Sequence, residues 1–131
     1  MSDLRKFYGN FRAVNQISVG IPQGECFGLL GVNGAGKTTT FKMMTGDELI
    51  SSGQAYLDGY SVNTEIKQVQ QRLGYCPQFD ALIEQMTVRE HLYMFARLRG
   101  VEEKEIEDIV DDLIDNLLLK DHEHKQAKDL R

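Results

Sequence analysis

Long apolar runs are missing from this sequence of 131 residues. The longest strongly apolar run spans residues 26–32, whereas a transmembrane helix needs roughly 20 apolar residues. The first residues are not followed by an apolar stretch with a small-residue cleavage site, so we expect no secretion and a cytosolic setting. The sequence therefore predicts no direct insertion of this stretch into a membrane.

Cysteines and clustered basic residues are scarce as well. Cys26 and Cys76 are the only cysteines, which excludes a disulfide scaffold and predicts two buried, reduced thiols. Lys and Arg do not form the stripe that follows a phosphate backbone, so we expect no nucleic-acid partner. Residues 102–131 carry eleven acidic and five basic side chains. The acidic residues within 102–115 favour the solvated face of a helix, with a partner contact as the alternative.

The remaining composition is that of an ordinary globular chain. Apolar residues make up 41% and charged residues 27% of the sequence, and the formal net charge is −5. These values exclude intrinsic disorder, and the length fits one domain or a large piece of a bigger one.

The first half of the sequence predicts alternating strands and helices. Residues 17–21 alternate in polarity as a half-buried strand does, and residues 26–31 form an unbroken apolar run typical of a strand buried on both faces. Residues 38–45 lack helix breakers and precede Gly46, which predicts a short helix with Phe41, Met44 and Thr45 on one side. Further along, the pattern predicts a tight hairpin turn at Asp58-Gly59 and a helix near residues 66–73. Residues 75–78 predict a strand that runs into a loop at Pro77.

The last third of the sequence predicts two helices. Thr87 and Glu90 are spaced as a capping box at the start of a helix over residues 88–99. Apolar residues at helical spacing from Ile106 to Leu118 predict a second helix with an acidic outer face. The pattern fails afterwards, so residues 120–131 are expected to be frayed or unfinished. His91, His122 and His124 are expected on the surface.

A glycine-rich loop carries the clearest chemistry. Residues 31–38 read Gly-Val-Asn-Gly-Ala-Gly-Lys-Thr and fit the pattern G-x-x-x-x-G-K-[ST] of a phosphate-binding loop. Glycines let successive backbone amides surround phosphate oxygens, and the helix that follows points its positive end there. Lys37 is placed to neutralise the β and γ phosphates, and the Thr38 hydroxyl is placed to bind Mg²⁺. Asn33 is expected to shape the loop, and Thr39 is expected either to contact a phosphate or to cap the helix. The candidate phosphate-binding residues are Asn33, Gly34, Ala35, Gly36, Lys37, Thr38 and Thr39.

The loop alone does not distinguish a GTPase, a small-molecule kinase and a transport ATPase. No Asn-Lys-x-Asp stretch occurs, which counts against a GTPase. Residues 8–14, 24–40 and 74–82 resemble the nucleotide-binding domain of an ATP-binding cassette (ABC) transporter, and the resemblance covers nearly the whole chain. Three further strings most resemble the A subfamily, whose members are large membrane proteins that mostly handle lipids: residues 76–80, 87–91 and 95–100.

The resemblance implies an α/β fold of the P-loop NTPase type, as in ABC ATPases, present in part. Residues 1–85 would hold an antiparallel β subdomain and the phosphate-loop core, and residues 86–131 would begin the helical subdomain. The resemblance also implies ATP and Mg²⁺ as ligands. The implied partners are the transmembrane domain of a transporter and a second nucleotide-binding domain. This soluble segment would lie at the cytosolic face of a membrane, as part of an integral membrane transporter.

Two single residues receive a role from the resemblance. Tyr8 would stack on adenine, with Phe7 or Phe11 as alternatives and ordinary edge-strand packing as a further one. Gln78 would reach Mg²⁺ and the attacking water, and its place after a predicted strand end agrees with where α/β sheets present ligand groups.

The resemblance also marks a surface. Phe79, Leu82, Met86 and Tyr93 fall where the family receives the coupling helices of its membrane domain. A core role suits Leu82 and Met86 equally well.

Three functions stay open. The family's Leu-Ser-Gly-Gly signature, its strand ending in Asp-Glu and its switch histidine are not among these residues. We therefore expect Lys37 and Gln78 to be the catalytic residues present, with weak Mg-ATP binding and negligible ATPase activity by this chain alone. The leading hypothesis is the ATP-binding portion of a transporter motor domain that powers lipid transport. The alternatives are a truncated, non-hydrolysing isoform and an unrelated P-loop kinase.

Overall fold

The chain forms two compact units, Met1–Cys76 and Pro77–Arg131. The structure, a computed structural model, describes residues 1–79 and 81–130. Among these residues, no helix is long and apolar enough to cross a bilayer.

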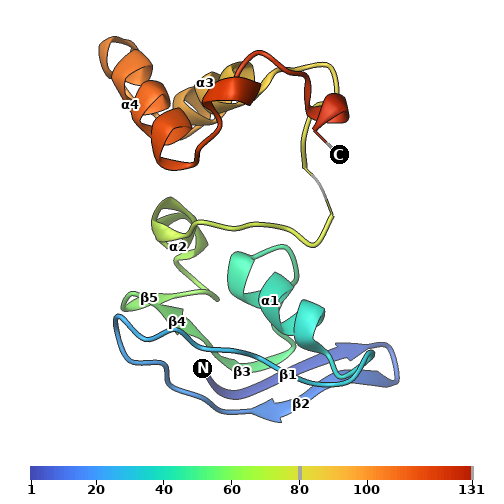
Figure 1. Ribbon diagram of the computed structural model, residues 1–131. Coiled ribbons are helices and arrows are strands. Elements are labelled where there is room, and N and C mark those ends of the chain that lie inside the picture. The colour runs from blue at the N-terminus through green and yellow to red at the C-terminus, as the bar shows by residue number, and fades with distance from the viewer. Residues whose placement is uncertain (80, 131) are drawn as a thin grey trace. The chain divides into compact units, whose positions relative to one another are not determined.

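An antiparallel sheet underlies the first unit (Figure 1). Strands β1 (Ser2–Tyr8) and β2 (Phe11–Ile17) form a hairpin, and β3 (Ser52–Gln54) pairs with the other edge of β1, which gives the order β2-β1-β3. A second hairpin consists of β4 (Tyr56–Leu57) and β5 (Tyr60–Ser61). Its turn residues, Asp58 and Gly59, have φ values of 50° and 82°, so the predicted tight turn is confirmed.

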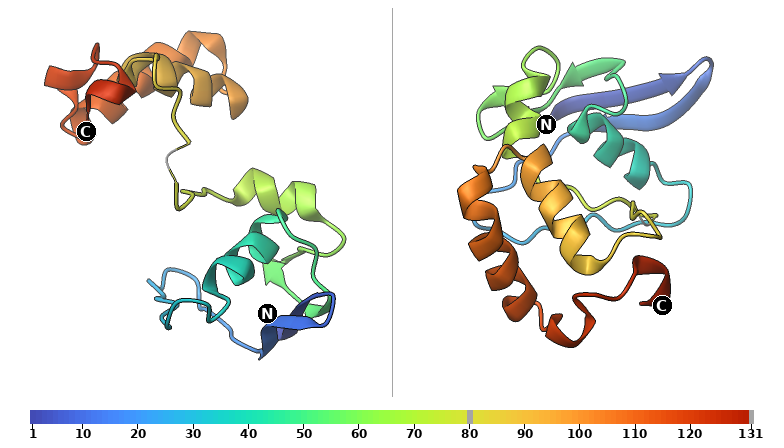
Figure 2. Two further views of the ribbon diagram at one scale, coloured as in Figure 1. Left: turned by 90° about the vertical axis from the view of Figure 1, so that its right-hand side faces the viewer. Right: turned by 90° about the horizontal axis from the view of Figure 1, so that it is seen from above.

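Two helices complete the core of the first unit. They are α1 (Lys37–Thr45), which lies against the sheet in Figures 1 and 2, and α2 (Ile66–Arg72). Buried apolar side chains come from the sheet, both helices and the positions on either side of the second hairpin: Leu4, Val14, Met43, Ala55, Val62 and Val69. The predicted helix and its left-handed cap at Gly46 are confirmed. The predicted buried side is partly wrong, because Met43 enters the core whereas Phe41 is 51% exposed.

The strands predicted over residues 17–21 and 26–31, and the strand predicted from residue 75 to the loop at Pro77, are wrong. β2 already ends at Ile17, and the other two stretches have no regular structure. Leu30 and Val32 are 91% and 80% exposed, because no described strand lies beside them to pair with their backbone. The prediction of buried thiols is wrong for the same reason, since Cys26 and Cys76 are both exposed.

The second unit is helical. Helices α3 (Val88–Leu98) and α4 (Glu103–Asn116) lie side by side (Figure 2). Ile106, Val110 and Ile114 of α4 are fully buried, and Leu92, Tyr93 and Ala96 of α3 pack against them. The two predicted helices and the capping box are thus confirmed.

Residues 120–130 are ordered, which corrects the prediction of a frayed end over residues 120–131 for all but Arg131, which lies outside the described residues. Two short 3-10 helices, η1 (Lys120–His122) and η2 (Ala127–Asp129), lie within this segment. Between them, Gln126 forms a β-bridge with Thr87, at the start of α3. Backbone hydrogen bonds compensate for the lost apolar pattern: the N–H groups of Val88, Arg89 and Ala127 donate to the carbonyl groups of Lys125, Glu123 and Met86.

Candidate phosphate-binding site

The glycine loop leads directly into α1 (Figure 1). Gly34 and Gly36 have φ values of 85° and 87°, in the left-handed region that favours glycine. The Ala35 N–H donates to the Val32 carbonyl oxygen at 3.1 Å, which closes a turn between them. Two left-handed glycines within three residues produce the tight curl that a phosphate-binding loop requires.

The loop is supported at one end and open at the other. A Cβ atom on Gly36 would lie only 2.4 Å from the carbonyl oxygen of Ala13 and 3.2 Å from Cγ2 of Val14. A Cβ atom on Gly34 would meet nothing within 4 Å. The loop therefore rests on β2 at Gly36, and a ligand can approach its backbone at Gly34.

Lys37 bends back across the loop that precedes it. Its Nζ donates to the carbonyl oxygens of Gly31 at 2.6 Å and of Val32 at 2.9 Å. These bonds hold the ammonium group at the loop and use two of its three N–H donors. A phosphate oxygen carries a negative charge, so it is a stronger partner for this group than a carbonyl oxygen.

The three threonines of the first helical turn differ in burial. Thr38 is exposed and Thr39 is half-buried, whereas the buried Thr40 hydroxyl donates to the Gly36 carbonyl oxygen at 2.9 Å. No acidic residue lies in the first turn of α1, so no carboxylate there neutralises the partial positive charge of the helix N-terminus. Backbone amides, one ammonium group and an exposed hydroxyl are a donor set that fits a polyphosphate with Mg²⁺.

Tyr8, at the end of β1, has charged neighbours that sequence reasoning missed. The residue is 44% exposed, and Nζ of the buried Lys6 lies 4.9 Å from the ring centroid. The Lys6 ammonium also pairs with Glu48 at 2.8 Å. The bonds from Lys6 and, secondly, from the Tyr8 hydroxyl hold the pKa of the Glu48 carboxyl below its usual range. The sequence did offer one signal for Lys6: it lies two residues before Tyr8, and residues two apart on a strand share a face.

Gln78 belongs to the second unit, next to Pro77, so its link to the glycine loop is carried by the resemblance alone.

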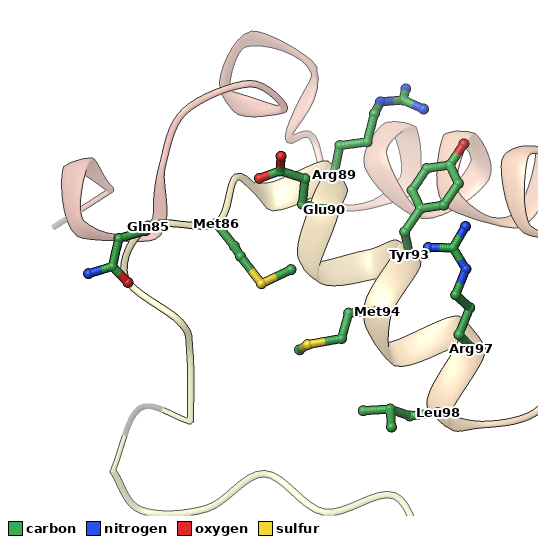
Figure 3. A pocket seen from close by; sticks show the side chains of 8 residues that line it. All are labelled: Gln85, Met86, Arg89, Glu90, Tyr93, Met94, Arg97 and Leu98. Atoms are coloured by element: carbon green, nitrogen blue, oxygen red, sulfur yellow. The ribbon is translucent and has the colours of Figure 1, made fainter.

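A pocket of about 860 Å³ lies along α3 in the second unit (Figure 3). Its lining residues are Gln85, Met86, Arg89, Glu90, Tyr93, Met94, Arg97 and Leu98. Met86 and Tyr93, two of the four residues marked as a surface, thus line the pocket, while Phe79 and Leu82 do not.

His91 is buried, which corrects its predicted place on the surface. Its Nε2 atom accepts a hydrogen bond from the Ile83 N–H at 2.9 Å. The ring proton must therefore sit on Nδ1, which lies 2.9 Å from the Thr87 carbonyl oxygen and donates to it. The side chain joins α3 to the loop before it. Paired donors and acceptors explain how a polar ring is buried here.

Comparison with known families decides between the P-loop classes. The family model described as "ABC transporter" matches residues 14–130. The chain belongs to the ABC transporter family. A solved chain described as "Structure of ATP binding subunit of ABC transporter" matches 95% of this chain and 52% of that chain, with 27% identity and a TM-score of 0.81. The predicted fold, a partial ABC ATPase with an antiparallel β part and helices, is confirmed.

Curated relatives of this ABC chain lie in the A subfamily. It is 53% identical over 131 residues to "Phospholipid-transporting ATPase ABCA3" of Rattus norvegicus. This match covers 98% of this chain and 8% of that protein. It is 62% identical over 97 residues to "Retinal-specific phospholipid-transporting ATPase ABCA4" of Homo sapiens. That match covers 74% of this chain and 4% of the human protein. The chain therefore spans less than a tenth of the length of these relatives.

Proposed function

We propose that this chain is the ATP-binding portion of the motor domain of an A-subfamily ABC transporter, in which ATP hydrolysis powers lipid transport across a membrane. The observation that carries the proposal is the glycine loop, with left-handed Gly34 and Gly36 and with Lys37 folded over it. The names of the rat and human relatives, both phospholipid-transporting ATPases, support lipid as the transported class.

Each site residue has a defined task in this proposal. The amides of residues 33–39 and the Lys37 ammonium bind the phosphates of ATP, and the ring of Tyr8 stacks on adenine. Thr38 and Gln78 would hold Mg²⁺, which would supply charge neutralisation at the phosphates. Lys37 stabilises the charge that develops during phosphoryl transfer, and Gln78 orients the attacking water.

The complete site requires partners. We assign residues 1–85 to the β subdomain and phosphate-loop core, and residues 86–131 to the start of the helical subdomain. The transmembrane domain of the transporter docks at the pocket along α3, whose lining combines Met86, Met94 and Leu98 with charged side chains (Figure 3). A second nucleotide-binding domain closes over the phosphates at the cytosolic face of the membrane.

Calorimetric titration of the chain with Mg-ATP tests this proposal. We expect binding that Lys37→Ala weakens at least about tenfold, because a charge-assisted contact to phosphate is lost. Lys67→Ala, a change at an exposed lysine of α2, serves as the matched control and leaves the affinity unchanged. Equal binding by the Lys37→Ala and unmodified chains would overturn the assignment of the loop. ATPase activity of the full-length protein, abolished by Lys37→Ala, would extend the result to turnover.

A further inference from the structure

Lys6 is buried in a way that calls for an explanation. Among the lysines of residues 1–79 and 81–130, it alone is buried, with 8% of its surface exposed. Removing an ammonium group from water is costly unless other groups pair with it. Lys6 also lies outside the glycine loop, so the phosphate-binding geometry does not account for its burial.

Three partners surround the Lys6 ammonium group. Its Nζ donates to the carbonyl oxygen of Leu49 at 2.8 Å and pairs with Oε2 of Glu48 at 2.8 Å. The ring centroid of Tyr8 lies 4.9 Å away, within the range of a cation–π interaction. Two hydrogen bonds and one ring contact match the three N–H groups of an ammonium. Lys6 thus ties β1 to the segment that follows α1.

The same contacts fix the ring of Tyr8. The Lys6 ammonium lies over the ring, and Glu48 holds that ammonium through its ion pair at 2.8 Å. Tyr8 as a whole is still 44% exposed, so part of the residue remains accessible to a ligand. A ring that is held before binding loses less rotamer freedom when a base stacks on it.

We propose that Lys6 and Glu48 are positioning residues for Tyr8, which hold one face of its ring and leave the opposite face for a nucleobase. This inference rests on the proposed function, which includes the stacking role of Tyr8. It also favours Tyr8 over its neighbours. Phe7 and Phe11 are exposed too, but within the described part of the chain neither ring has a cation over it.

Two ligands separate base stacking from phosphate binding. Mg-ATP carries adenine, whereas Mg-tripolyphosphate offers only the phosphates. We expect Tyr8→Ala to weaken Mg-ATP binding about tenfold, the usual range for a lost base–aromatic stack. Lys6→Met keeps the apolar stem and removes the charge, and it should weaken Mg-ATP binding roughly threefold to tenfold. Neither change should alter the affinity for Mg-tripolyphosphate.

A double-mutant cycle tests whether Lys6 acts through Tyr8. The Lys6→Met/Tyr8→Ala variant should bind Mg-ATP no more weakly than Tyr8→Ala alone, because Lys6 has no ring left to position. Lys67→Met, at an exposed lysine of α2, is the matched control and should change neither affinity. If Lys6→Met does not fold, Glu48→Gln provides the same test and should weaken Mg-ATP binding roughly threefold.

The outcomes distinguish the two proposals. Loss of Mg-ATP affinity in Tyr8→Ala but not in Lys6→Met or Glu48→Gln would overturn the positioning role and leave the proposed function intact. Equal weakening of both ligands by folded Lys6→Met would also overturn it, because the effect would then be a general disturbance of the unit. If the unmodified chain bound neither ligand, the proposed function itself would fail.

Discussion

The two units use their polar side chains differently. In the first unit, an apolar core built from the sheet, both helices and the residues beside the second hairpin supports the glycine loop. Both hydrogen bonds of the Lys37 side chain go to carbonyl groups of the loop itself. Such a loop is supported by its scaffold and is left open for a ligand.

In the second unit, charged side chains hold the two helices and the last segment together. Arg89 of α3 pairs with Glu107 at 3.2 Å and with Asp111 at 2.6 Å, both in α4. It also pairs at 2.8 Å with Glu123 of the last segment, residues 120–130. These carboxylates raise the pKa of Arg89, the bond from Glu123 first and that from Asp111 second. Among residues 77–79 and 81–130, the fully buried apolar side chains all come from α4. Charged bonds therefore supplement a small core in the second unit, whereas in the first unit they shape a site.

Gly36→Val should show the largest effect and confine it to the first unit. The left-handed backbone and the short approach to Ala13 together should destabilise that unit by about 3 kcal/mol. Urea unfolding followed by methyl NMR, with Met43 reporting on the first unit and Ile114 on the second, measures this. Gly34→Val is the matched control with strain but no clash, and its cost should be near ~1 kcal/mol. Equal costs would show that the contact with β2 does not matter.

The same comparison explains which elements the sequence predicts. The capping box at Thr87 and Glu90, the left-handed cap at Gly46 and the turn at Asp58-Gly59 depend on residues within one turn of each other, and all three are confirmed. The apolar run at residues 26–31 is not a strand, because a strand of that composition depends on neighbours distant in sequence. Local chemistry was predictable and long-range pairing was not.

The site divides in the same way. The glycine loop and Lys37 follow from a motif of eight residues, and the structure gives them the expected curl. Lys6 and Glu48 are 42 positions apart in the sequence, and no motif joins them. Their pairing beside Tyr8 emerges only when α1 returns the chain to β1.

His91→Leu should have the next largest effect, this time in the second unit. The change leaves the Ile83 N–H and one bond of the Thr87 carbonyl oxygen without a side-chain partner, which should destabilise the unit by about 2 kcal/mol. The Ile114 methyl signal should therefore report unfolding at lower urea, while the Met43 signal stays unchanged. His124→Leu, at a histidine with a 78% exposed side chain, is the control. An unchanged midpoint in His91→Leu would contradict the buried bonds.

Arg89→Gln should cost less, about 1 kcal/mol, because Asp111 and Glu107 can turn to solvent when their partner is removed. Amide hydrogen exchange should then rise in residues 120–130, which Arg89 helps to hold against α3 through Glu123. Arg97→Gln removes a pair with Glu103 in which both side chains are exposed, and it should leave exchange in that segment unchanged. The comparison thus separates a bond that joins segments from one that lies on the surface.

Acid should produce the smallest effect and should act more strongly on the second unit. There, Arg89 lowers the pKa of Glu123, Arg97 lowers that of Glu103, and the Thr87 amide lowers that of Glu90, whereas Glu48 has a lowered pKa in the first unit. Because each folded pKa lies below the ordinary value of 4.5, the unfolded chain takes up protons first as the pH falls. The stabilisation from these carboxylates is complete above that value and is lost as the pH falls below it.

Urea unfolding at neutral and at strongly acidic pH measures this difference. The urea midpoint reported by the Ile114 methyl signal should fall more steeply than the midpoint reported by Met43, and Glu123→Gln should reduce the difference. Parallel curves for the two signals would show that these carboxylates do not set the acid sensitivity, and that the charged bonds of the second unit contribute no more than those of the first.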